Sequence, residues 1–182
     1  MTKSFKYICI ALTALIFVSC DQYPSLQKYY VDSQASTEFI ALDIPASIVS
    51  LKEEDASEET RETLKSIKKI NFLGYQITED NTEEYKAEQQ KVKEILKNPK
   101  YQDLIRVGSG GKSLVVKFLG EEDAIDEVIF YGADKELGFA LVRVLGDGME
   151  PSKMMELAQQ VNIDDDSASI QQITSFMKNV SE

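Results

Sequence analysis

An alternation of apolar and polar residues between Tyr101 and Asp147 is the strongest pattern in the chain. It predicts four short strands, near Leu104–Val107, Ser113–Leu119, Ile125–Tyr131 and Leu137–Leu145. Turns rich in Gly and Asp separate these runs, which is typical of an antiparallel meander. Two earlier apolar runs, at 37–44 and 70–77, predict further strands.

Three other segments repeat their apolar residues at helical spacing. One helix is expected from Thr82 to Lys97, a second after Pro151, and a third over the last fifteen or so residues. Their apolar stripes, which include Met154, Leu157 and Phe176, are interpreted as core packed against the sheet. The predicted fold class is therefore α+β: a mainly antiparallel sheet of about four to six strands, covered on one face by amphipathic helices.

The first residues have the pattern of a secretory signal. Lys3 and Lys6 precede an apolar stretch from Tyr7 to Val18. This stretch is too short to cross a hydrocarbon core, which needs roughly 20 residues. The alternative is a buried N-terminal helix.

The end of this stretch, Phe17-Val18-Ser19-Cys20, resembles a bacterial lipobox. The resemblance implies cleavage between Ser19 and Cys20 and acylation of Cys20. The predicted organisation is a signal peptide over 1–19, a lipidated Cys and tether over 20–34, and one α+β domain over 35–182. Within the tether, Tyr29 and Tyr30 are expected to dock on the domain, and a binding platform is the alternative.

Composition excludes several kinds of chemistry. The chain has no His, no Trp and only two Cys, Cys9 and Cys20, so it has no Ser-His-Asp triad and no His-ligated zinc or haem. The formal net charge of -11 argues against nucleic acid as a partner. No catalytic residue and no cofactor are predicted, and the protein is not expected to be an enzyme.

Two motifs that could bind a ligand fail on inspection. The run from Val107 to Ser113 has Arg106 where a Walker A loop needs Gly, and the following residues are strand-like, so a hairpin turn explains its glycines. Asn162, Asp164 and Asp166 match the start of a calcium loop, but Ser167 stands where that loop needs Gly.

The acidic clusters are interpreted as helix caps and solvated surface, and no metal site is predicted. The alternative is an acidic metal- or glycan-binding protein, or a carboxylate-based hydrolase. Such a hydrolase would need two carboxylates about 5–10 Å apart in a cleft.

Several segments resemble the family called domain of unknown function 4252, small lipoproteins of the Gram-negative envelope. The similarity is carried by Ser25–Tyr30, by Phe39–Pro45, and by the meander with the helix at Pro151. It implies an envelope lipoprotein anchored to a membrane, the outer membrane being favoured, with its domain outside the cytoplasm. It carries over no functional residues. An association of such proteins with extracytoplasmic sigma-factor systems is in keeping with a regulatory role.

The resulting hypothesis is a lipid-anchored, noncatalytic interaction module whose partner is another envelope protein. A purely structural tether remains an alternative. The contact surface is predicted at the open face or edge of the meander, around Ser113–Leu119 and Leu137–Val144, where Gly110, Gly111 and Gly138 would allow close approach of a partner backbone.

Overall fold

The computed structural model describes residues 23–52, 56–163 and 167–179. Ser19, Cys20 and the acidic runs at 53–55 and 164–166 lie outside these ranges. The helices are α2 (Leu26–Gln34), α3 (Glu58–Ser66), α4 (Thr82–Leu96), α5 (Pro151–Gln160) and α6 (Ala168–Asn179), with a 3-10 turn at Ala46–Ile48. The strands are β1 (Phe39–Pro45), β2 (Val49–Leu51), β3 (Ile67–Gln76), β4 (Gln102–Ser109), β5 (Lys112–Glu121), β6 (Ala124–Asp134), β7 (Gly138–Met149) and β8 (Val161–Ile163).

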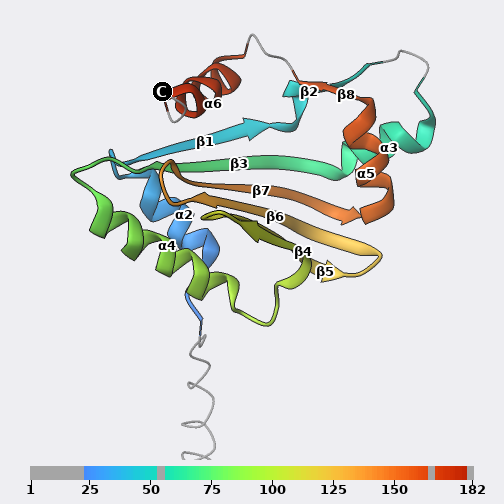
Figure 1. Ribbon diagram of the computed structural model, residues 1–182. Helices are drawn as coiled ribbons and strands as arrows, with labels where there is room; N and C mark the ends of the chain where they lie inside the picture. The colour runs from blue at the N-terminus through green and yellow to red at the C-terminus, as the bar shows by residue number, and fades with distance from the viewer. Residues whose placement is uncertain (1–22, 53–55, 164–166, 180–182) are drawn as a thin grey trace, which may run out of the picture.

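Six strands form one antiparallel sheet in the order β1-β3-β7-β6-β5-β4 (Figure 1). β4 to β7 form the predicted meander, and β1 and β3 extend it beyond β7. A second, two-stranded sheet pairs β2 with β8. The α+β class and the antiparallel sheet are confirmed.

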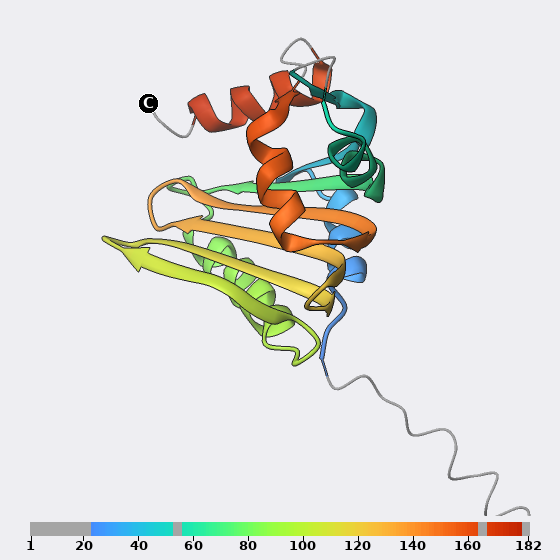
Figure 2. The ribbon, with the colours of Figure 1, turned by 90° about the vertical axis from the view of Figure 1, so that its right-hand side faces the viewer.

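Helices lie on both faces of the sheet, whereas the sequence pattern predicts them on one. α2 and α4 cover one face, called here the α4 face, and α5 and α6 cover the other, the α6 face (Figure 2). The reason is visible in the strands, where consecutive apolar residues such as Val115-Val116 and Val128-Ile129 point to opposite sides. A sheet that is apolar on both sides needs two covering layers.

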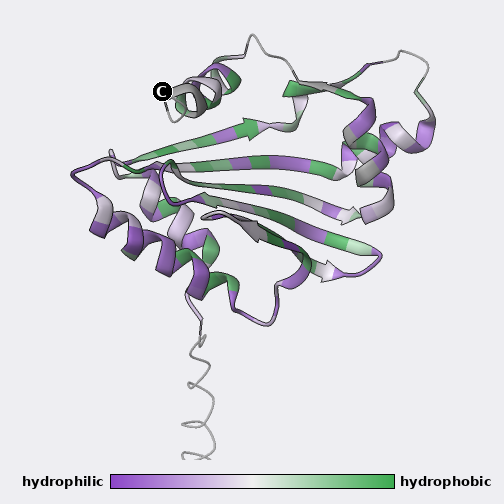
Figure 3. Ribbon diagram, in the orientation of Figure 1, coloured by the Kyte–Doolittle hydropathy of each residue, from purple (hydrophilic) through white to green (hydrophobic). Residues whose placement is uncertain are grey.

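The larger core lies on the α4 face. Val92, Ile95 and Leu96 of α4 pack there against buried residues of the strands. Tyr75 and Phe139 stack at the centre of this layer with ring centroids 5.6 Å apart. The outer surface of α4 is hydrophilic (Figure 3), as its charge pattern predicts. This core holds α4 firmly alongside the strands.

The segment 26–34, expected to be part of a tether, is instead helix α2. Ser25 caps the helix by accepting a hydrogen bond from the Lys28 backbone N–H. Leu26 and Tyr30 are 0% and 2% exposed, and the Tyr30 hydroxyl donates to the Leu42 carbonyl oxygen at 2.8 Å. The docking of the tyrosine pair is confirmed, and the packed part of the chain begins with this helix.

Asn81 precedes α4 without capping it: its side chain makes no cap bond to the helix, and its Oδ1 accepts from the Thr78 N–H at 2.7 Å. The helix that begins at Pro151 ends at Gln160, and Val161 begins β8. The core role of Met154, Leu157, Ile170, Ile173 and Phe176 is confirmed.

Candidate functional site: the open edge of the sheet

β4 is an edge strand of the main sheet, and all eight of its residues are exposed. Three of them are large and apolar: Leu104, Ile105 and Val107 are 49%, 44% and 56% exposed. An edge strand has backbone N–H and C=O groups on its outer side that no strand of the sheet pairs. β4 therefore combines free hydrogen-bonding capacity with exposed apolar surface.

On the α6 face this edge continues into an apolar stripe made of Ile105, Val107, Leu114 and Phe130. Cross-strand register places Ile105 opposite Val116, which lies opposite Phe130, and places Val107 opposite Leu114. Leu114 and Phe130 are 39% and 40% exposed. In Figure 2, α5 crosses β3 and β7 and leaves the β4 end of the sheet uncovered.

On the α4 face the same edge borders a groove of about 690 Å³ between α4 and the β4–β5 hairpin. Its lining contains Lys93 and Lys97 from α4, Arg106 from β4 and Lys117 from β5, against a single acid, Asp103. We call it the basic groove. This local excess of cations contrasts with the formal net charge of -11 of the whole chain.

The cations of the groove differ in how firmly they are held. Lys117 is buried, and its Nζ donates to the Tyr101 carbonyl oxygen and approaches Asp103 Oδ1, both at 2.9 Å. Its hydrogen bond, assisted by the charges of Lys117 and Arg106, holds the pKa of Asp103 below its usual value despite partial desolvation. Arg106 pairs with the same carboxylate at 3.0 Å but remains 61% exposed.

The two α4 lysines are exposed at the rim of the groove. Lys93 Nζ donates to Gln89 Oε1 at 2.6 Å, and Lys97 Nζ pairs with Glu94 at 2.7 Å. These are exposed partners on the same helix, and such surface pairs contribute little stability. Lys93, Lys97 and Arg106 can therefore turn toward a ligand at small cost.

A row of residues that are all polar except Ile129 crosses the α4 face of the sheet, with half-exposed aspartates at its two ends. Register aligns Asp43, Asn71, Arg143, Ile129, Lys117 and Asp103 across all six strands. The Arg143 guanidinium binds Glu127 at 2.6 Å and Gln27 at 2.8 Å, and Asp43 accepts from Tyr30 and Asn71. Because Gln27 and Tyr30 belong to α2, their hydrogen bonds to Arg143 and Asp43 fasten this helix to the sheet.

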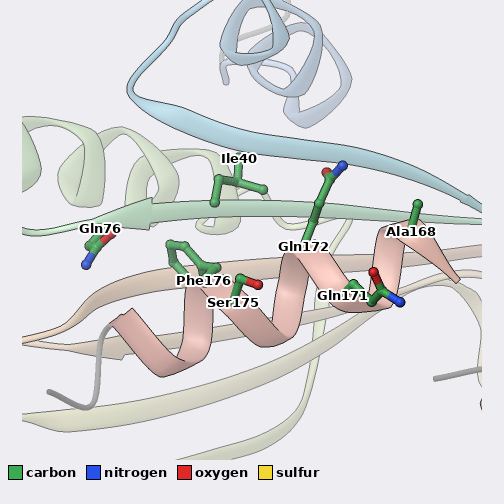
Figure 4. A pocket seen from close by; sticks show the side chains of 7 residues that line it. All are labelled: Ile40, Gln76, Ala168, Gln171, Gln172, Ser175 and Phe176. Atoms are coloured by element: carbon green, nitrogen blue, oxygen red, sulfur yellow. The ribbon is translucent and has the colours of Figure 1, made fainter. Parts of the chain in front are cut away.

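Within the described ranges, no group of three or more His, Cys, Asp or Glu side chains is placed to hold a metal ion. Another hollow, of about 550 Å³, lies between α6 and the β1–β3 edge (Figure 4). Gln76, Gln171, Gln172 and Ser175 give it a polar but uncharged lining beside Phe176. A smaller hollow of about 120 Å³ is lined mainly by acids, Glu59, Glu62 and Glu150, beside Lys153. Among these hollows, the one beside β4 has a lining with an excess of cations.

The structure does not support the contact surface predicted from the sequence. Leu137–Val144 overlaps β7, which lies in the middle of the sheet with Phe139 and Leu141 buried. Ser113–Leu119 is in β5, one strand in from the edge, and four of its side chains are buried. Of these segments, only Leu114 contributes an exposed large apolar side chain.

The glycines of the meander serve its turns. Gly110 and Gly111 have φ of 62° and 90° and form the β4–β5 turn, which confirms the hairpin. Gly138 has φ of 121°, and a Cβ there would lie 2.0 Å from the Tyr75 carbonyl oxygen. The close approach at Gly138 is therefore to β3 within the chain.

The edge residues were missed because a meander does not reveal which of its strands ends the sheet. Leu104–Val107 was predicted as the first strand of the meander, and a first strand is a candidate edge. Whether β1 or β3 would pair with it was not visible in the sequence.

The comparison with protein families identifies the chain. The family described as "Domain of unknown function (DUF4252)" matches residues 29–157, and the chain belongs to this family. The match begins within α2, ends within α5 and contains the whole six-stranded sheet. No curated protein and no solved structure matches the chain.

None of the helices in the described part of the chain is long and apolar enough to cross a membrane.

Proposed function

We propose that this protein is a noncatalytic interaction module of the cell envelope, anchored to a membrane through acylated Cys20 and regulatory in role. The observation that carries the interaction part is the open β4 edge, with its apolar stripe on one face and basic groove on the other. A second envelope protein is the proposed partner.

The position of α2 supports a short link between anchor and domain. Only residues 21–25 separate Cys20 from Leu26, the buried first residue of α2. Six extended steps along the chain span at most about 20 Å. An acyl group on Cys20 would hold the domain against the membrane surface, where lateral diffusion brings it to other envelope proteins.

The buried charges support a noncatalytic role. Glu127, Arg143 and Lys117 each bind a neighbouring polar group inside the protein, so their charges stabilise the packing. A general acid or base needs a titratable group within reach of a substrate. The exposed surface at β4 instead offers backbone groups that can pair with another strand and apolar side chains that can contact it.

Metabolic labelling with an alkyne fatty acid tests the anchor. We expect Cys20→Ala to abolish labelling of the full chain in cells and Cys9→Ala to leave it unchanged. Cys9 is the matched control because it lies inside the apolar signal stretch. Labelling that survives in Cys20→Ala would refute the anchor.

Photo-crosslinking in cells tests the interaction edge. A photoreactive residue at position 107 is compared with one at position 31, because Val107 and Val31 are similarly exposed, on β4 and α2 respectively. We expect a discrete adduct with an envelope protein from position 107 only, weakened by Cys20→Ala. The same adducts from both positions, or none from position 107, would contradict the proposal.

A further inference from the structure

We propose that the β4 edge binds an extended segment of its partner in which acidic and apolar residues alternate. This inference rests on the proposed interaction function and names the chemistry of the partner. Its basis is that the two sides of this edge differ. Arg106 lines the basic groove, whereas Ile105 and Val107 belong by register to the apolar stripe, Val107 at the place where the stripe borders the groove.

The alternation follows from strand geometry. A segment that adds to a sheet edge pairs through its backbone and points successive side chains to opposite faces. Side chains on one face of such a segment would lie beside the basic groove, and those on the other face beside the apolar stripe. An acid at every second position, with an apolar residue between, therefore satisfies both faces at once.

Acidic residues fit the basic groove because four of the five charged side chains in its lining are cationic. Directly opposite residues on paired strands have Cβ atoms about 4.5–5.5 Å apart, close enough for Arg106 to reach a carboxylate. The Arg106 fork can bind a carboxylate through two parallel hydrogen bonds. Lys93 and Lys97 extend the positive charge along α4, beyond β4 itself.

Apolar residues fit the α6 face because Ile105 and Val107 stand on the edge strand itself, with Leu114 on β5 and Phe130 on β6 behind them. Apolar side chains of an added strand would remove part of this surface from water. With eight residues in β4, the strand can pair a segment of about that length. The register with β5 shifts at Leu104, so regular pairing along β4 is interrupted at that residue.

A second copy of this chain is a poorer occupant. On the α4 face β4 itself presents Asp103 and Arg106, and Asp103 is already bound to Lys117 and Arg106. An antiparallel copy would bring another arginine to a groove that is already cationic. The charge of the groove thus favours a different, acidic strand.

The test measures binding of a fluorescent octapeptide to the full-length lipoprotein in detergent micelles. The probe alternates glutamate with valine. One control replaces glutamate with lysine, and another has the same composition in two blocks, four glutamates followed by four valines. We expect the alternating acidic peptide to bind at least about tenfold more tightly than either control. Equal binding of the block peptide would overturn the alternation, and equal binding of the lysine peptide would overturn the acidic preference.

Matched variants locate the binding at β4. Arg106→Glu is compared with Lys68→Glu, since the two cations are 61% and 60% exposed and each pairs with one surface aspartate, Asp103 or Asp147. Loss of a cross-strand charge attraction plus a new repulsion of similar size predicts about twofold to thirtyfold weaker binding for Arg106→Glu. Lys68→Glu should bind as the unmodified protein does.

A second pair of matched variants tests the apolar stripe. We expect Val107→Asp to weaken binding by about tenfold and Val31→Asp to leave it unchanged, because only Val107 lies in the stripe. Far-ultraviolet circular dichroism of each variant checks that it is folded. A folded Val107→Asp variant that binds normally would overturn the proposed place of the segment.

Other occupants give different results. Vesicles rich in phosphatidylglycerol that compete with the peptide, with competition lost in Arg106→Glu and kept in Val107→Asp, would indicate an anionic surface and overturn the proposal. A dimer in sedimentation that dissociates in Val107→Asp would indicate a second copy and also overturn it.

The two proposals can fail separately. A crosslinked partner whose adduct maps to a segment without alternating acids would overturn this inference and leave the interaction function standing. The absence of any partner at position 107 would contradict the interaction function itself.

Discussion

The two edges of the sheet are treated in opposite ways. β1 lies between helices: its even-numbered residues Ile40, Leu42 and Ile44 pack in the α6 cluster, and Phe39 and Ala41 pack in the α4-face core beside α2. β4 has exposed side chains along its whole length. In Figure 1, α6 runs alongside β1, while the β4 end of the sheet has no such cover on the α6 face.

The difference shows where this fold needs stability and where it can accept a partner. β1 is joined to the core by packing on two faces and by the bonds of Tyr30. β4 is protected in another way, by the charges of Asp103 and Arg106 and by the register shift at Leu104. Charges and irregularities discourage indiscriminate pairing at an edge without closing it.

The largest expected loss of stability follows from a change in α6, the helix that packs over β1. Phe176 of α6 is buried against Phe72, with ring centroids 5.9 Å apart, and its Cζ lies 2.9 Å from where a Cβ on Gly74 would stand. Phe176→Ala should destabilise the protein by about 3–5 kcal/mol, the usual range for a buried Phe. Urea unfolding measures this loss, and hydrogen exchange should rise first in β1 and not in β4. A rise confined to β4 would contradict the comparison.

A pair of isoleucines compares the two edges directly. Ile44 on β1 is 4% exposed and Ile105 on β4 is 44% exposed. Ile44→Ala should lower the free energy of unfolding by about 2–4 kcal/mol because it opens a cavity. Ile105→Ala should change it by less than about 0.5 kcal/mol, as at most surface positions. Equal losses in urea unfolding would show that β4 is also part of the stabilising core.

Removal of the Tyr30 hydroxyl tests how strongly its hydrogen bonds hold α2 to β1. Tyr30→Phe leaves the ring in place and removes the donor to Leu42 and Asp43. We expect a loss of about 1 kcal/mol, typical of one hydrogen bond between partly buried groups. The midpoint of urea unfolding measures it, and Tyr23→Phe, at a partly exposed tyrosine before α2, is the control.

The smallest effect concerns the charge pair at the open edge. The pKa of Asp103 is depressed in the folded protein, mainly by its hydrogen bond from Lys117. The carboxylate therefore adds stability above its unfolded pKa, near 4, and this is lost as pH falls through the lower folded value. Asp103→Asn should cost less than about 1 kcal/mol at pH 7, because Asp103 is half-exposed and the buried Lys117 keeps its bond to the Tyr101 carbonyl oxygen.

The same variant should lose less stability than the unmodified protein between pH 5 and pH 2. Thermal unfolding across that range measures the slope. An unchanged slope would show that Asp103 does not contribute to the acid sensitivity.

Local patterns were sufficient to predict the elements whose signals lie within a few residues. The glycines at Gly110 and Gly111 predicted the β4–β5 turn, and the spacing of Tyr85, Val92, Ile95 and Leu96 predicted α4 and its buried face. Helix α2 was not recognised because its sequence is mostly polar, and its helical state depends on the burial of Leu26 and Tyr30. The candidate site was placed on the neighbouring strands because its true edge depends on pairing between distant segments.

By itself, the sequence determined the α+β class, the meander, the absence of histidine chemistry and the membership in the family that the comparison then identified. The first three follow from composition and from periods of two and 3.6 residues, which are local properties. The family membership follows from the resemblance of particular segments and from the family match. The tertiary structure alone decided the strand order, the covering of both faces and the position of β4 at an open edge between the basic groove and the apolar stripe. These depend on contacts between residues far apart in the chain, such as Gln27 with Arg143 and Lys117 with Asp103, and no local pattern specifies which distant segments meet.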